Sequence, residues 1–324
     1  MPRIFSGIQP SGELHIGNYL GAVRNWVGLQ HEFESFICIV NYHAITQPFE
    51  PVDLMRRTHE MAVSLLAAGI DPGVATLFVQ SHVPEHTELA WLLNTITPLG
   101  ELERQTQFKD KSSRQESVPA GLLNYPVLQA ADILLYHADI VPVGEDQIQH
   151  LELSREIARR WNARFAEGYF PEPQPKLTPT RRIMGLDGNA KMSKSLGNTV
   201  ALLEPTAAIW EKLRPAMTDP ARVRKTDPGN PDVCNIYQLH KAFSPEATQV
   251  HVAAQCRSAG WGCIECKRVL ADSMEVELVP IRARAVELAA HPQRVTDALG
   301  DGASRARSVA RTTIDEVRER MGIA

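Results

Sequence analysis

The sequence predicts an α/β protein in which a doubly wound parallel sheet is followed by a second, all-helical domain. Short apolar runs at residues 35–40 and 75–80 are typical of buried strands, and segments with helical spacing lie between and around them. Such alternation favours a parallel sheet with helices on its faces. At 324 residues the chain is long enough for two domains, because single hydrophobic cores seldom grow beyond about 250 residues.

The first half of the chain carries the predicted sheet. Residues 54–69 have apolar side chains at helical spacing, and Gly69 suits the end of that helix because glycine tolerates the left-handed conformation. Three further elements are predicted: a helix over residues 121–137, a short strand over 140–143 and a helix over 146–165. Residues 171–175 are predicted to form a surface loop, because their three prolines cannot lie in an uninterrupted helix.

The second half is predicted to be helical. Strand signals fade after residue 195, and helical spacing returns in four segments, at residues 205–214, 246–255, 280–291 and 303–321. We therefore expect a sheet-containing domain over residues 1–200 and an all-helical domain over residues 201–324.

The composition is that of an ordinary globular protein, with 44% hydrophobic and 22% charged residues. This excludes a disordered or fibrous chain. The net charge of -4 means that a polyanionic partner must be met by a local basic face. No signal-peptide pattern and no run of about 18 apolar residues occurs, so we expect a cytoplasmic protein without a membrane span.

Near the N-terminus a further strand is predicted to end in a turn rich in glycine and proline. Residues 7–18 read GIQPSGELHIGN, and a helix is predicted to begin near His15. Such a turn exposes backbone N–H groups and the positive end of a helix to an anion. Gly12 and Gly17 would let a phosphate approach closely, while His15 and Asn18 can donate hydrogen bonds to it. Taken alone, the pattern fits a tight turn with a surface histidine equally well.

A second motif, KMSKS, lies at residues 191–195, after the glycine-rich residues 185–189. Two lysines on a mobile loop can close on a triphosphate and stabilise the charge that develops on the departing oxygens. The alternative is a solvated lysine and serine loop, which becomes improbable in company with the first motif.

Four of the five cysteines are grouped late in the chain. Cys234, Cys256, Cys263 and Cys266 are separated by 21, 6 and 2 residues. Four thiolates suit an iron–sulfur cluster or Zn²⁺, and free thiols are the third alternative. Cys38 lies in a predicted strand and is interpreted as a core residue.

The two phosphate motifs resemble those of the class I aminoacyl-tRNA synthetases. His15-Ile16-Gly17-Asn18 resembles their HIGH signature, and residues 191–195 match their KMSKS signature letter for letter. Residues 7–12, 121–136 and 141–147 resemble the tryptophan-specific branch, and the resemblance covers essentially the whole chain. Three alternative functions remain: a synthetase of the tyrosine-specific branch, a nucleotidyltransferase, and a synthetase-like protein that binds RNA or tryptophan as a sensor without catalysis.

The resemblance implies a Rossmann-like catalytic domain and a helical domain that binds the tRNA anticodon. The implied reaction uses ATP and Mg²⁺ to activate L-tryptophan as its adenylate and then transfers tryptophan to tRNA(Trp), in a homodimer. The catalytic residues would be His15, Asn18, Lys111, Lys191 and Lys194. The ATP site would comprise Gln9, Pro10, Ser11, Gly17, Asn18, Gly144, Glu145, Asp146, Ile183, Lys191, Met192, Ser193, Lys194 and Ser195.

The tryptophan site implied by the resemblance centres on Asp132, which would accept the indole N–H. Its other residues would be Phe5, His43, Tyr125, Val141, Val143 and Gln147. The neighbours of Asp132 in sequence are apolar, so its buried charge needs a partner, and a substrate donor is one. A structural arginine or a backbone N–H is the alternative. Phe5 and Tyr125 fit plain core aromatics equally well.

The helical domain carries two further features. A basic group, comprising Arg222, Arg224, Lys225, Lys267 and Arg268, is the candidate tRNA contact, although a charged surface usually means only solvation. A subset of bacterial tryptophan enzymes carries a 4Fe–4S cluster on a similar cysteine array, preceded by stretches resembling residues 218–224 and 227–231. The first gap here is one residue shorter than in that pattern. The cluster is expected to staple the helical domain and to take no part in adenylate chemistry.

Overall fold

A computed structural model describes residues 1–113, 116–144, 147–177 and 183–324, without the side chains of Lys111 and Ser195. Its centre is a parallel sheet of five strands in the order β3-β2-β1-β4-β5. The strands are β1 (Arg3–Ile8), β2 (Glu34–Ile39), β3 (Thr76–Val79), β4 (Ile140–Val143) and β5 (Gln174–Leu177). The predicted α/β class and the three predicted strands are confirmed.

Helices surround the sheet and then continue without strands. The first group is α1 (Ile16–Asn18), the π-helical turn η1 (Tyr19–Val23), α2 (Arg24–Leu29), α3 (Asn41–Ala44), α4 (Pro51–Ala68), η2 (Gln80–His82), α5 (Glu85–Asn94), α6 (Leu99–Glu103), α7 (Thr106–Ser112), α8 (Ala120–Leu134) and α9 (Ile148–Phe165). The second is η4 (Lys194–Leu196), α10 (Thr206–Leu213), η5 (Pro231–Val233), α11 (Asn235–Phe243), α12 (Glu246–Arg257), α13 (Cys263–Ala290) and α14 (Pro292–Met321).

The strands β1 to β4 are buried on both faces of the sheet, whereas the edge strand β5 is exposed. Along β2, Ile37 and Ile39 belong to one core cluster, whereas Phe36 and Cys38 belong to the other. The alternation follows from the two-residue period of a strand. The first cluster is completed by side chains of α4 and α13, the second by those of α5, α8 and α9. The interpretation of Cys38 as a core residue is confirmed.

Two predictions around proline were wrong. Residues 171–175 were expected to be a loop, yet β5 begins at Gln174 and contains Pro175. An edge strand tolerates proline because its outer backbone groups need no partner strand. The helix expected at residue 280 begins instead at Cys263 and continues through Pro280, because buried residues on either side, such as Met274 and Ile281, keep helical spacing.

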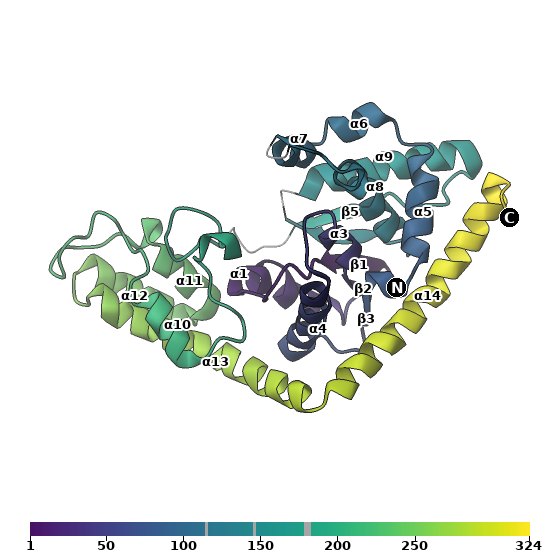
Figure 1. The fold of residues 1–324 in the computed structure, drawn as a ribbon. Helices are drawn as coiled ribbons and strands as arrows, with labels where there is room; N and C mark the ends of the chain where they lie inside the picture. The colour runs from purple at the N-terminus through teal and green to yellow at the C-terminus, as the bar shows by residue number, and fades with distance from the viewer. Residues whose placement is uncertain (114–115, 145–146, 178–182) are drawn as a thin grey trace.

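The two longest helices lead back to the sheet. Figure 1 shows α13 and α14, coloured green to yellow, running from the α10–α12 group around the sheet-containing part. α13 packs on α4, and α14 packs on β3 and α5. At Gly302 of α14 an added Cβ would lie 1.8 Å from the carbonyl oxygen of Leu77, so the helix backbone rests directly on the edge strand. Arg305 also donates to the carbonyls of Pro72 and Ala75.

Candidate active site

The candidate site lies where the sheet order changes direction, between β1 and β4. β2 and β3 extend the sheet on one side of this pair, and β5 on the other. The carboxyl ends of β1 and β4 lead into residues 9–18 and residues 144–147. In open parallel sheets, ligands bind in the crevice at such a switch point.

His15 caps the helix that follows β1. Its Nδ1 accepts the backbone N–H of Asn18 at 3.2 Å, so in the neutral ring the proton is on Nε2. Burial lowers the pKa of His15 from 6.5 to about 4, helped by the charges of Lys194 and Lys191. His15 is therefore a neutral hydrogen-bond donor at pH 7.

The loop of residues 191–195 closes against the glycine-rich turn. Gly12 has a φ of 128°, and an added Cβ there would lie 3.2 Å from Nζ of Lys194. At Gly17 an added Cβ would lie 3.0 Å from the His15 ring and 3.2 Å from Cβ of Met192. The two phosphate motifs, far apart in sequence, therefore form one surface. Burial lowers the pKa of Lys194, whose surroundings also include Glu13 and Arg57.

Asp132 lies in α8 and is almost completely buried, with 1% of its surface exposed. Oδ2 accepts from His43 Nε2 at 2.7 Å, and Oδ1 accepts from Gln80 Nε2 at 2.7 Å and from His86 Nδ1 at 2.6 Å. Burial alone raises the pKa of Asp132, but the imidazoles of His43 and His86 outweigh it and hold the pKa below its ordinary value. The carboxylate is thus ionised at neutral pH.

The surroundings of Asp132 differ from those expected from the sequence. Its charge was expected to require a substrate donor, an arginine or a backbone N–H, yet side chains of the protein already stabilise it. Gln80 and His86 were missed, as was Tyr136, whose hydroxyl lies 2.8 Å from Nε2 of His86. The available signal was the polar stretch that follows β3 at the carboxyl edge of the sheet.

The other predicted tryptophan residues fall into an apolar and a polar group. Phe5, Val141 and Val143 are buried in the second core cluster, where Phe5 stacks on Tyr136 with ring centroids 5.8 Å apart. The polar group surrounds Tyr125, whose ring meets His43 edge to face at 6.3 Å. The Tyr125 hydroxyl lies 3.1 Å from His150 Nε2, and His150 Nδ1 lies 3.1 Å from Gln147 Oε1. Burial raises the pKa of Tyr125 to about 12.

Several predicted ATP residues are only partly described. Glu145 and Asp146 lie outside the described residues, as do the side chains of Lys111 and Ser195. Gln9 and Ser11 are exposed in the turn, and Pro10 is buried between them. The Ile183 carbonyl accepts from the backbone of Met192 and the Gly144 carbonyl from the backbone of Gln147.

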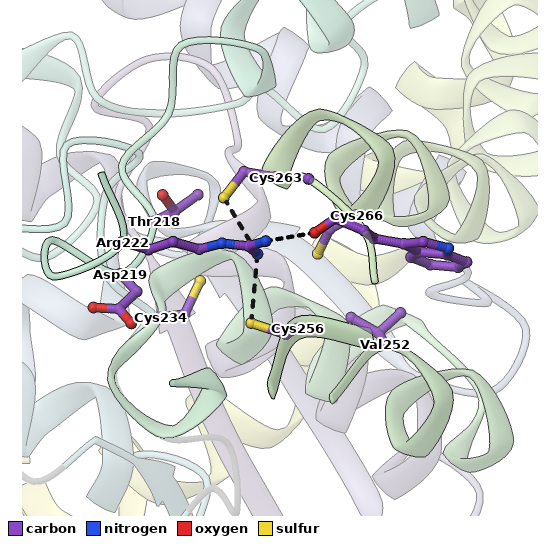
Figure 2. Close-up of a pocket in the computed structure, with 10 residues that line it drawn as sticks. Thr218, Asp219, Arg222, Cys234, Val252, Cys256, Cys263 and Cys266 are labelled. Atoms are coloured by element: carbon purple, nitrogen blue, oxygen red, sulfur yellow. Dashed lines mark hydrogen bonds between the residues drawn. The ribbon is translucent and has the colours of Figure 1, made fainter. Parts of the chain in front are cut away.

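The four late cysteines line one small cavity. Cys234 precedes α11, Cys256 lies near the end of α12, and Cys263 and Cys266 begin α13. Figure 2 shows the guanidinium of Arg222 between Cys256 and Cys263, with Nη1 4.0 Å from each sulfur. Burial and, to a smaller extent, the neighbouring cysteines together raise the pKa of Cys266 to about 12. As the described side chains stand, no three potential ligands are arranged to hold a metal ion.

The predicted basic tRNA surface was partly wrong. Lys267 is only 4% exposed and donates to the carbonyls of Arg214 and Ala216, while Arg222 points into the cysteine cavity. Arg268 packs 3.6 Å from the centre of the Trp210 ring. Charge in a sequence does not distinguish a side chain that faces solvent from one that neutralises buried carbonyls.

Comparison with known proteins shows the family of the chain. The family described as tRNA synthetases class I (W and Y) matches residues 1–278. The chain belongs to this family. The predicted membership of the class I aminoacyl-tRNA synthetases is thereby confirmed.

The relatives of this class I synthetase match it along almost its whole length. It is 55% identical to tryptophan–tRNA ligase of Deinococcus radiodurans over 99% of both chains. It is 47% identical to tryptophan–tRNA ligase of Thermosynechococcus vestitus, over 98% of this chain and 99% of the relative. The structure of tryptophanyl-tRNA synthetase from Campylobacter jejuni, complexed with ADP and tryptophan, superposes with a TM-score of 0.90 at 36% identity, covering 99% of both chains.

Among the described residues of this synthetase, no helix has the length and apolar character needed to cross a bilayer.

Proposed function

We propose that the chain is a tryptophan–tRNA ligase, which activates L-tryptophan with ATP and transfers it to the 3′ end of tRNA(Trp). The observation that carries the chemistry is the approach of Lys194 to Gly12 and His15, which combines two phosphate-binding motifs. The full-length relatives named tryptophan–tRNA ligase support the choice of amino acid.

Adenylate formation needs no protein nucleophile. The tryptophan carboxylate attacks the α-phosphorus of ATP, the bond to the bridging oxygen breaks, and pyrophosphate leaves with its electrons. Lys191, Lys194 and neutral His15 would stabilise the charge on the departing oxygens, with Asn18 and Lys111 assisting. Mg²⁺ carried by the ATP phosphates would neutralise part of the same charge. The other residues of the ATP site implied by the resemblance, including Glu145, Asp146 and Ser195, are proposed to contact ATP as well.

Asp132 is proposed to accept the indole N–H. The ionised carboxylate has about four acceptor positions and three of its hydrogen bonds are internal, which leaves capacity for one more donor. Because the carboxylate is already oriented by His43, Gln80 and His86, no side chain has to reorganise when the indole binds. We propose Phe5, Val141 and Val143 as apolar walls, and His43, Tyr125 and Gln147 as polar groups of the same site.

A homodimer is proposed on the basis of an apolar groove beside this site. The groove has a volume of about 920 Å³ and includes Phe49, Trp91 and Tyr125. Trp91 is 69% exposed, and an exposed aromatic patch of this kind is typical of an association surface. Trp91→Glu should then convert a dimer into a monomer in size-exclusion chromatography with light scattering.

We also propose that the four cysteines hold a 4Fe–4S cluster, which would staple the helical part of the chain. The donor set fits, since a cluster of this type takes four thiolates. Nε of Arg222 is buried without an acceptor among the described residues, so the cavity offers a donor to an anionic group. Its guanidinium would have to move aside. Zn²⁺ and free thiols are the alternatives, and analysis of anaerobically purified protein for iron, sulfide and zinc separates the three.

The domain roles follow the same proposal. Residues 1–200 would bind ATP and tryptophan, and residues 201–324 would contact the tRNA anticodon, in the cytoplasm, where tRNA is charged. Arg224, Lys225 and Arg268 are the exposed members of the basic group, and they are proposed to meet RNA.

The proposed function is tested by pyrophosphate exchange with tryptophan, tyrosine and no amino acid. Exchange that depends on tryptophan, and charging of tRNA(Trp), are the expected results. Exchange with tyrosine in preference would assign the tyrosine branch, and absence of exchange in the presence of tight tryptophan binding would favour a sensor.

A further inference from the structure

The loop of residues 191–195 is anchored at its base by a side chain from the helical part of the chain. Asn235, the first residue of α11, donates through Nδ2 to the carbonyl of Gly185 at 2.7 Å. Asn235 is only 8% exposed, so water cannot readily replace this hydrogen bond. The bond joins two segments that are 50 residues apart in sequence.

A second connection reaches the neighbouring residue. Lys267 donates through Nζ to the carbonyls of Arg214 and Ala216, each at 2.7 Å. Directly after Ala216, the backbone of Met217 donates to the carbonyl of Leu186 at 2.8 Å. Gly185 and Leu186 are thus both held by groups outside their own segment.

Gly185 transmits this anchoring to the catalytic loop. Its backbone N–H donates to the carbonyl of Ala190 at 2.7 Å, immediately before Lys191. Asn198 lies so close that a Cβ on Gly185 would meet its Nδ2 at 2.0 Å, and Oδ1 of Asn198 accepts the backbone N–H of Ser193 at 2.8 Å. A shift of Gly185 would therefore displace the residue before Lys191 directly and, through Asn198, the residue before Lys194.

We propose that Asn235 is a positioning residue for adenylate formation, because its hydrogen bond to Gly185 fixes the base of the loop that carries Lys191 and Lys194. The inference rests on the proposed function of that loop. Asn235 acts through the loop and not by contact with the reacting atoms. Since the lysines contribute mainly in the transition state, loss of the anchor lowers kcat and leaves the KM for tryptophan unchanged.

The test is tryptophan-dependent pyrophosphate exchange by Asn235→Ala. We expect kcat to fall roughly tenfold, the factor that corresponds to one lost buried hydrogen bond, with the KM for tryptophan unchanged. Gln249→Ala is the matched control, because it removes a bond of the same kind, from Nε2 to the Ser244 carbonyl at 2.8 Å, in the same helical part. The control is expected to retain the wild-type kcat. Asn235→Ser replaces the first variant if that one fails to fold.

A double-mutant cycle separates positioning from general destabilisation. In a background that carries both Lys191→Ala and Lys194→Ala, the Asn235 change is expected to have little further effect on kcat, because both lysines that it positions are gone. A full additional fall in kcat, or a lower Tm with unchanged kcat, would overturn the inference.

Limited trypsin digestion tests the anchor without relying on activity, since trypsin cleaves after lysine. Faster cleavage at Lys191 and Lys194 in Asn235→Ala than in Gln249→Ala supports the anchor, and equal cleavage overturns it. Wild-type protein without tryptophan-dependent exchange would refute the proposed function, and digestion would still decide whether Asn235 holds the loop.

Discussion

Asp132→Asn is the most informative change to the candidate site. Three donors surround the carboxylate, from His43, Gln80 and His86. An asparagine amide has one oxygen and one nitrogen, so its N–H groups must face at least one of these donors. Because a hydrogen bond to a charged group contributes about 1.5–3 kcal/mol and a neutral one about 1, we expect the free energy of unfolding to fall by about 2–4 kcal/mol.

The same change should weaken the proposed bond to the indole N–H. The kcat/KM for tryptophan is expected to fall by about tenfold to a hundredfold, and the KM for ATP should stay close to wild type. Pyrophosphate exchange at varied tryptophan and ATP measures both, and thermal unfolding measures stability. Asp139→Asn is the control, since that carboxylate is exposed and accepts only the backbone N–H of Arg3 among the described partners. A folded Asp132→Asn variant with unchanged kcat/KM for tryptophan would remove Asp132 from the site.

Lys194→Ala should lower kcat about a hundredfold with little change in tryptophan affinity. Weaker ATP binding with unchanged kcat in the same exchange assay would contradict the proposed role of Lys194 in stabilising the departing pyrophosphate. The folded pKa of His15 lies below its unfolded value, so stability should be lost as pH falls from 6.5 to about 4, by up to about 3 kcal/mol. Urea unfolding at several pH values measures this, and a His15→Gln protein with the same pH dependence would refute the assignment. Anaerobically purified protein should contain about four irons and four sulfides per chain. One zinc per chain would refute the iron–sulfur cluster but leave a structural metal site that links the helical segments. Metal-free protein with four alkylatable thiols would refute both. Cys263→Ser should lower the Tm or the rate of tRNA charging and leave pyrophosphate exchange largely intact. A loss of pyrophosphate exchange with unchanged Tm and tRNA charging would show that the cavity acts in adenylate formation.

The sequence was informative where structure is local. The turn after β1 and the strand β4 could be predicted because glycine spacing and a short apolar run determine them without reference to the rest of the chain. The assignment of the two phosphate motifs to one ATP site came from the resemblance, and only the folded structure shows that Lys194 lies against Gly12.

Other features depend on packing and could not be predicted. Gln80, His86 and Tyr136 lie on or beside different elements. Gln80 and His86 reach Asp132, and Tyr136 reaches His86, only when β3, α5 and α8 pack together. Lys267 was assigned to the surface from its charge, although its ammonium group is buried against two carbonyls. A proline such as Pro280 is a strong start signal for a helix, but a long helix with buried side chains on either side of the proline can tolerate the loss of one backbone hydrogen bond.

The contact between α14 and β3 has a consequence for biosynthesis. A strand at the edge of a sheet exposes unpaired backbone groups that can recruit another chain, and here Gly302 rests on Leu77 at that edge. A chain is made from its N-terminus, so β3 is synthesised long before the helix that covers it. During synthesis, β3 is therefore an uncovered edge strand that can pair with another chain until α14 has left the ribosome. Gly302→Val should accordingly increase aggregation of newly made protein.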